Sequence, residues 1–197
     1  GQTVRDNYGL PIHPATPPGS YRVEVGLYDA ETGQRLLAPG GEGQVWLEPV
    51  VVERPPTPAP AAALGMAQAA GVDFGPLRLL GYDAHRLGFA HEPRVALHPG
   101  DVLHVNLYWQ AREAPRDEWQ VRLRLVGPGD LAVADVAGAP AGAYATSLWQ
   151  AGDVWRGQFD LPLPGSAPPG HYRLQVSPLA PEGGEQEPFV IELVVQE

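Results

Sequence analysis

The stretch VWRGQFDLPLPGSAPPGHYRLQV, residues 154–176, decides the fold because it occurs twice in the chain. Its counterpart is TVRDNYGLPIHPATPPGSYRVEV at 3–25, and VWLEPVVVE at 45–53 later matches FVIELVVQE at 189–197. A repeat of this length indicates one structural unit present more than once. The positions that are identical at the constant offset are Arg5 and Arg156, Leu10 and Leu161, Pro11 and Pro162, Pro17 and Pro168, Pro18 and Pro169, Gly19 and Gly170, Tyr21 and Tyr172, Arg22 and Arg173, and Val25 and Val176.

The repeat has the pattern of short strands joined by stiff corners. Apolar residues alternate with polar ones over 21–27, which predicts a strand buried on one side. A Pro-Pro-Gly corner precedes it in both copies, with the prolines restricting the backbone and the glycine permitting the turn. Tyr21 and Tyr172 follow these corners as the tyrosine of an immunoglobulin-like corner does, so we expect both to be structural.

Residues 72–197 read as a complete domain. Alternating apolar runs occur at 76–84, 103–109, 119–125, 131–137, 155–163, 172–176 and 189–195. About seven strands in a domain of this size predict an all-β, immunoglobulin-like antiparallel β-sandwich. A long connection of small residues, 138–153, is the kind that carries a chain from one sheet to the other in a Greek key.

The first copy lacks the front half of this pattern. Residues 1–53 therefore predict the C-terminal half of a first sandwich, three strands beginning at 4–12, and the Pro/Ala-rich residues 54–71 predict a linker. Three strands with one apolar face need a cover. Two covers are open: the same half-sandwich of a second chain, giving a homodimer through 1–53, or the chain's own second domain.

Composition excludes several functions. The chain has 197 residues, a net charge of −10 and no cysteine, and all 13 of its cationic side chains are arginine. The acidic balance argues against a nucleic-acid partner, and the lack of cysteine rules out disulfides and cysteine-ligated metals. No apolar run approaches the roughly 18 residues of a membrane span. Because it starts in mid-repeat, the chain reads as an excised fragment, whose contact with a membrane would run through absent parts of a parent protein.

Aromatic residues supply the candidate ligand site. Tyr144 and Trp149 lie in a loop before a strand, where they could stack on a glycan, although packing across the end of the sandwich is the simpler interpretation. Trp109 alternates with apolar residues in a strand and is expected in the core. His104, Asn106 and Tyr108 share the opposite face of that strand.

No catalytic, metal or cofactor site is predicted. The six histidines have no HxH or HExxH spacing and are interpreted as solvated loop residues. The carboxylates are scattered over turns without a calcium-loop pattern. Arg122, Arg124 and Arg173 could form a basic strip on one sheet, and we expect acidic side chains to pair with it.

Three phrases carry a resemblance: LYWQA at 107–111, the string at 144–176, and PPGSYRVEVGLYDAETGQRL at 17–36. They resemble a repeated module of Chloroflexi-type bacteria, found in the soluble tail of membrane glycosyltransferases of the mannosyltransferase-like kind and in uncharacterised extracytoplasmic proteins. The resemblance marks the module and not a catalytic centre, so it implies location and context only. SPLAPEGGEQ departs from the first copy's GLYDAETGQR.

Two functions follow as expectations. The first is a non-catalytic structural or accessory module outside the cytoplasm or at the cell surface, in a membrane-associated bacterial protein. The alternative is a carbohydrate-binding module. An enzyme is not expected, because the motifs for nucleophilic, metal or phosphate chemistry are missing from the sequence.

Overall fold

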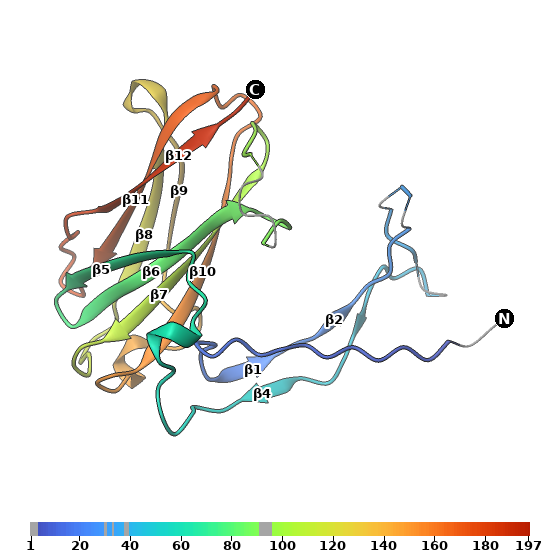
Figure 1. The fold of residues 1–197 in the computed structure, drawn as a ribbon, viewed down its shortest axis with the longest axis horizontal. Helices are drawn as coiled ribbons and strands as arrows, with labels where there is room; N and C mark the ends of the chain where they lie inside the picture. Colours follow the sequence, from blue (N-terminus) through green and yellow to red (C-terminus); the bar gives the residue numbers. More distant parts are fainter. Residues whose placement is uncertain (1–3, 30, 33, 38–39, 91–95) are drawn as a thin grey trace. The chain divides into compact units, whose positions relative to one another are not determined.

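The computed structural model describes residues 4–29, 31–32, 34–37, 40–90 and 96–197. The chain divides into two compact units (Figure 1). One, here called the sandwich, contains residues 1–16 and 57–197, and the other, the hairpin unit, contains 17–56.

The sandwich consists of two four-stranded antiparallel sheets. The first sheet has the strand order β10-β7-β6-β5 and the second has the order β12-β11-β8-β9. The strands are β5 (Gln68–Phe74), β6 (Leu77–Arg86), β7 (Val102–Ala111), β8 (Gln120–Val126), β9 (Ala132–Gly138), β10 (Val154–Pro162), β11 (Gly170–Leu179) and β12 (Phe189–Val195).

The pairing pattern is immunoglobulin-like, as expected. β7 pairs with the distant β10 in one sheet, while β8 pairs with the distant β11 in the other. Residues 139–153 carry the chain from β9 in the second sheet to β10 in the first, so the long connection is a crossing between sheets. Leu97 forms a parallel bridge with Val195 of β12. This bridge ties the segment before β7 to the second sheet.

The core lies between the sheets. Its largest fully buried side chains include Trp109, Trp149, Trp155 and Tyr172. Alternate residues of β7 face inward, from Leu103 to Trp109, because side chains of a strand alternate between the two faces of its sheet. The predicted core position of Trp109 is confirmed by its 0% exposure.

Tyr172 forms the expected corner. Its hydroxyl group donates to the carbonyl of Pro168 at 2.6 Å, while its ring is fully buried. The ring lies so close to Gly127 that a Cβ there would meet it at 2.5 Å. The Pro-Pro-Gly corner is thereby attached to the core.

The hairpin unit contains two short ladders. β1 (Gly19–Tyr21) pairs with β4 (Val50–Val52), and β2 (Glu24–Val25) pairs with β3 (Val45–Trp46). An isolated bridge joins Tyr28 and Arg35 farther along the same hairpin.

This arrangement corrects the predicted half-sandwich. The three-stranded sheet over 1–53 is wrong, since residues 4–12 form no strand and only two chain segments pair. Pro11 has no backbone amide hydrogen to donate to a neighbouring strand, and the side chains of 4–12 are exposed. It belongs with the sandwich, as does everything from Thr57 onward.

The linker also ends earlier than expected. Residues Ala61–Ala63 form a single 3-10 turn, η1, and β5 already begins at Gln68, inside the predicted linker of 54–71. β5 escaped the sequence analysis because QAAGVDF has small residues and a glycine in place of a clear alternation. None of the helices in the described residues is long and apolar enough to cross a membrane.

Candidate functional site

The outer face of the first sheet carries a group of interacting polar side chains, here called the polar face. Strand register places them in three rows across β6, β7 and β10. The rows are His85–His104–Asp160, Asp83–Asn106–Gln158 and Gly81–Tyr108–Arg156. Alternation in β7 puts His104, Asn106 and Tyr108 outward because Leu103, Val105 and Leu107 point into the core.

The first row contains a histidine–aspartate pair. The Nδ1 of His104 lies 2.6 Å from Oδ1 of Asp160, and since a carboxylate accepts, Nδ1 is the donor. The ring of His85 lies 5.2 Å from that of His104, and its Nδ1 donates to the carbonyl of Arg86 at 2.9 Å. Asp160 is the exposed member, with 55% of its side chain accessible.

Asp83 connects the other two rows. One oxygen accepts from the hydroxyl of Tyr108 at 2.7 Å and from the amide of Asn106 at 3.3 Å, and the other accepts from the backbone N–H of Ala67 at 2.7 Å. Burial, and then the hydrogen bond to Asp83, raises the pKa of Tyr108 well above its ordinary value. Tyr108 therefore stays a neutral donor, and Asp83 fastens β6, β7 and the segment before β5 together.

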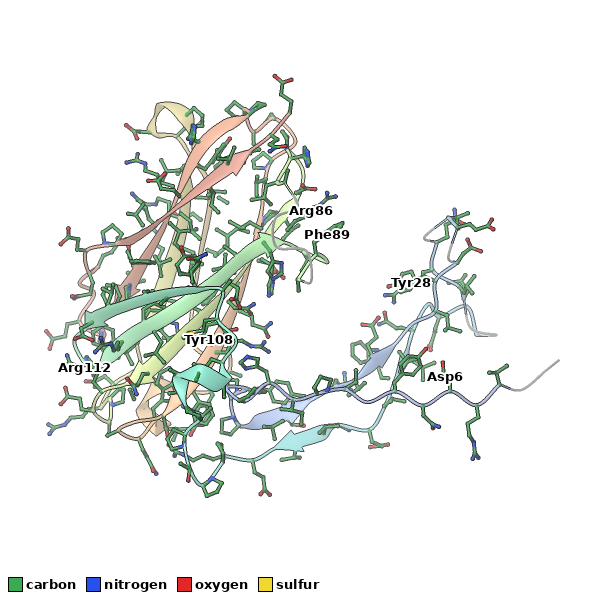
Figure 2. The ribbon with its side chains drawn as sticks, viewed as in Figure 1. Asp6, Tyr28, Arg86, Phe89, Tyr108 and Arg112 are labelled. Atoms are coloured by element: carbon green, nitrogen blue, oxygen red, sulfur yellow. The ribbon has the colours of Figure 1, made fainter. Side chains whose placement is uncertain are left out.

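Two segments, 13–16 and 59–67, lie against this face. They flank the hairpin unit in the sequence and are here called the legs. The ring of His13 lies 5.6 Å from that of Tyr108, which is visible on β7 in Figure 2. Ala15 accepts a 2.8 Å hydrogen bond from the backbone N–H of Arg156. Ala15, Leu64, Tyr108 and Val154 form a small buried cluster of their own.

His13 holds the two legs to each other. Its Nε2 donates to the carbonyl of Leu64 at 2.9 Å, and its Nδ1 accepts from the N–H of Ala15 at 3.1 Å. Both contacts require the neutral ring with its proton on Nε2. Burial lowers the pKa of His13 and Arg156 lowers it further, against the opposing effects of the Leu64 carbonyl and Asp83.

Two buried atoms of the polar face have no hydrogen-bond partner among the described residues: Oδ1 of Asn106 and Nε of Arg156. Asn106 is only 7% exposed. Most buried polar atoms in proteins are paired, so an unpaired one can mark where water or a ligand binds. Asn106 lies on β7 and Arg156 on the neighbouring strand β10, in adjacent rows of the polar face.

The two candidate stacking residues differ in how much of their side chains is exposed. Trp149 is 1% exposed, and its indole N–H donates to the carbonyl of Tyr144 at 3.3 Å. Tyr144 is half-buried, its ring packs edge-on at 5.4 Å against Trp155, and its hydroxyl donates to Leu148. Trp149 therefore has no free face for a sugar and packs in the core, whereas Tyr144 keeps part of its side chain exposed.

The interpretation of the histidines as solvated loop residues is wrong for three of them. His85 and His104 lie on adjacent strands with His85 8% exposed, and His13 is half-buried. Sequence spacing could not show this, because the residues meet through strand register. His91 lies outside the described residues. Among those that are described, no three His, Asp or Glu side chains are grouped closely enough to hold a metal ion.

The basic strip of the second sheet is paired, as expected. Arg122 binds both oxygens of Asp135, at 2.8 and 2.6 Å, and Arg124 lies 3.4 Å from the same carboxylate. The hydrogen bond from Arg122 lowers the pKa of Asp135. Arg173 contacts Asp130. This outer face is therefore a charged, internally neutralised surface.

Comparison with known proteins gives no family. No family model matches the chain, and no curated protein matches it. Among solved structures, the chain is similar to the C-terminal domain of Wzt, with a TM-score of 0.48, 19% identity, and coverage of 63% of this chain and 75% of that one. It is also similar to a Salmonella alpha-2-macroglobulin mutant, with a TM-score of 0.38 and 17% identity over 91% of this chain but 11% of that one. Both similarities are too low to support a functional argument. The structure itself shows an all-β protein built on an antiparallel β-sandwich.

Proposed function

We propose that the chain is a non-catalytic accessory module that acts outside the cytoplasm as part of a membrane-associated bacterial protein. The proposal rests on the hydrogen bonds that Asp83 and His13 make on and beside the polar face. Asp83 accepts from Ala67 of one leg and from Asn106 and Tyr108 of the sheet. His13 uses both ring nitrogens within the legs, joining one leg to the other through the carbonyl of Leu64. The carboxylate of Asp83 and the imidazole of His13, which serve catalysis in many enzymes, thus anchor the two segments that flank the hairpin unit in the sequence.

The His104–Asp160 pair is the arrangement closest to a catalytic one. A carboxylate that orients a histidine can prepare a general base, but a nucleophile must lie within reach of that base. The serines, Ser20, Ser147, Ser166 and Ser177, lie on other elements than the polar face. The pair therefore supports recognition or anchoring better than turnover.

The non-catalytic assignment is tested in the complete parent protein. Replacing the pair together, His104→Gln with Asp160→Asn, should leave the parent's turnover within about twofold of wild type, because neither side chain contributes to the core. A loss of tenfold or more with an unchanged unfolding midpoint would show that the pair takes part in catalysis.

The location is tested with thiol labelling, since the chain has no cysteine of its own. Leu131→Cys places a thiol at a position that is 64% exposed, whereas Leu107→Cys places one at a fully buried position. A membrane-impermeant maleimide added to intact source cells should label the first variant and not the second, with wild type as the blank. Labelling of Leu131→Cys only after lysis would place the module inside the cell.

A second candidate, glycan binding, is favoured by the unpaired Oδ1 of Asn106 and the exposed carboxylate of Asp160. Together with Gln158 they offer donors and acceptors along two neighbouring strands, which suits a ligand rich in hydroxyl groups. Millimolar oligosaccharide added to the ¹⁵N-labelled protein should shift the amides of β7 and β10. Gln158→Ala should weaken that response several-fold and Gln120→Ala, on the second sheet, should not. Shifts that are absent, or spread evenly over both sheets, would rule out this form of binding.

A further inference from the structure

Beyond its corner, the hairpin unit repeats the terminal hairpin of the sandwich in register as well as in sequence. Val25 pairs with Val45, as Val176 pairs with Phe189, and Glu24 pairs with Trp46, as Gln175 pairs with Val190. At the corner the register differs by one residue, because Tyr21 pairs with Val50, the counterpart of Val194, whereas Tyr172 pairs with Leu193. Around β2 and β3 the two hairpins therefore present corresponding residues on corresponding faces.

One face of the hairpin unit is apolar, and it is here called the apolar face. Its members follow from strand alternation and pairing: they are Tyr21, Val23, Val25, Leu27, Val45, Leu47, Val50 and Val52. Val25 is 45% exposed, Val45 52% and Leu47 50%. At its far end Val25, Leu27 and Val45 join Leu36 and Leu37 around a groove of about 330 Å³, with Glu42 at the rim. Contiguous apolar surface of this kind usually marks an interface.

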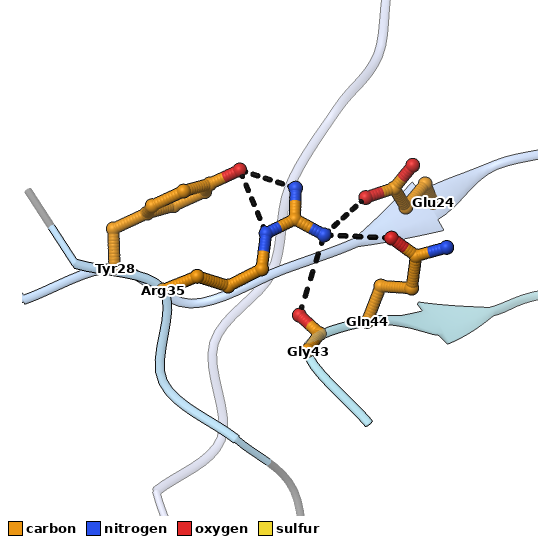
Figure 3. A network of polar contacts seen from close by, with 5 residues as sticks. All are labelled: Glu24, Tyr28, Arg35, Gly43 and Gln44. Atoms are coloured by element: carbon orange, nitrogen blue, oxygen red, sulfur yellow. Dashed lines mark hydrogen bonds and ion pairs between the residues drawn. The ribbon is translucent and has the colours of Figure 1, made fainter. Parts of the chain in front are cut away.

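The opposite face carries the charges (Figure 3). The guanidinium group of Arg35 donates to Glu24 at 2.8 Å and to Gln44 at 2.7 Å, and it also contacts the hydroxyl of Tyr28. Arg22 lies over the ring of Trp46 on this side, 5.6 Å from its centroid. The hydrogen bonds to Tyr28 and Glu24 raise the pKa of Arg35. Arg22, Glu24 and Arg35 thus lie on the side opposite the apolar face, and Glu42 is the charged residue in the lining of the groove.

In the sandwich, the face equivalent to the apolar face is fully covered. Tyr172, Leu174 and Val176 are 0% exposed and Ile191 is 3% exposed, because the inner side of the first sheet packs on them. The hairpin unit has the same surface without such a sheet. Another apolar β-sheet face would cover it in the same way.

Among the described residues, the hairpin unit is the part whose β-sheet face is both apolar and exposed. The inner sides of the two four-stranded sheets already pack on each other. Their outer sides carry, respectively, the polar face and the paired arginines of the second sheet. Neither outer side complements an uncharged apolar surface, whereas the apolar face complements itself.

We propose that the apolar face docks on the apolar face of a second copy of this chain. The pairing is isologous about a two-fold axis, so that each hairpin supplies the second layer that the other lacks. Val25, Val45 and Leu47 form the centre of this contact, and the charged face with Arg35 stays in water. The two hairpins together make the two-layered arrangement that the sandwich achieves within one chain.

The first test is the oligomeric state of the full chain in about 0.15 M salt, where the repulsion between two chains of net charge −10 is screened. Sedimentation velocity should show a dimer that dissociates on dilution. Val25→Asp should weaken association by tenfold or more, while Val51→Asp should leave it unchanged. Val51 is the matched control because it is a 70% exposed valine that faces the other side of the same hairpin, and both changes reduce strand propensity.

The second test traps the contact directly. Val45→Cys and Val51→Cys each introduce the only thiol of the chain. Mild oxidation should convert most of the Val45→Cys protein into a covalent dimer and little of the Val51→Cys protein. A wild-type monomer at every concentration would overturn the proposal, as would equal cross-linking of the two variants or equal effects of the two aspartates. A monomer in which Val45→Cys resists labelling would show that the apolar face is covered within its own chain.

Discussion

The hydroxyl of Tyr172 donates a 2.6 Å hydrogen bond to the carbonyl of Pro168, four residues earlier. Tyr172→Phe keeps the buried ring and removes only this bond, so it should lower the free energy of unfolding by about 1 kcal/mol. The equivalent bond of Tyr21 to Pro17, at 2.7 Å, is exposed, and Tyr21→Phe should change sandwich stability by no more than a few tenths of a kcal/mol. Urea unfolding followed by tryptophan fluorescence measures both. Equal losses would show that burial does not distinguish the two corners.

Gly157 of β10 lies against the connection from the second sheet, where a Cβ would meet the carbonyl oxygen of Pro140 at 2.0 Å. Gly157→Ala should therefore displace backbone and destabilise the sandwich by about 1–3 kcal/mol. Gly165→Ala is the matched control, because nothing lies within 4 Å of the added methyl group. The thermal midpoint should fall clearly for the first variant only. A Gly157→Ala protein as stable as wild type would mean that the connection is free to move away.

Asp83 anchors the leg that precedes β5. Asp83→Ala leaves the buried hydroxyl of Tyr108 without its acceptor, and an unsatisfied buried donor costs about 1–3 kcal/mol. It also removes the acceptor of the exposed N–H of Ala67. Amide hydrogen exchange should speed up at Ala67 by tenfold or more, while amides in the centre of β8 keep their protection. Asp73→Ala, an exposed carboxylate on β5, should leave the Ala67 exchange rate unchanged. Unaltered exchange in Asp83→Ala would show that packing alone holds the leg.

Acid should loosen the legs through His13. The pKa of His13 is lowered in the folded protein, so below the ordinary value of about 6.5 the unfolded chain binds the proton more readily. The contribution of the neutral ring to stability is complete above that pH and is lost as the pH falls through the lowered value. His13→Phe keeps a ring beside Tyr108 but has no proton to gain. The stability difference between wild type and His13→Phe should therefore shrink from pH 7.5 to pH 5, and a constant difference would contradict the assignment of the neutral ring.

The alternation of apolar and polar residues allowed most strands of the sandwich to be predicted from the sequence. The runs at 103–109, 119–125 and 189–195 fall within or beside β7, β8 and β12, because one buried face imposes a period of two on the sequence. The corner at 168–172 could also be predicted, because Pro-Pro-Gly followed by Tyr favours this turn through local backbone preferences. β5 was missed because its alanines and glycine carry no such period.

The duplication and the all-β sandwich were determined by the sequence alone, because both are written as local patterns of apolar spacing and turn residues. Only the tertiary structure decided that residues 4–12 form no strand, that Trp149 is buried, and that His85 and His104 lie on one polar face with His13 packed against it. These outcomes depend on which strand pairs with which and in what register. That choice is made by long-range packing of the whole sandwich, which no short stretch of sequence contains.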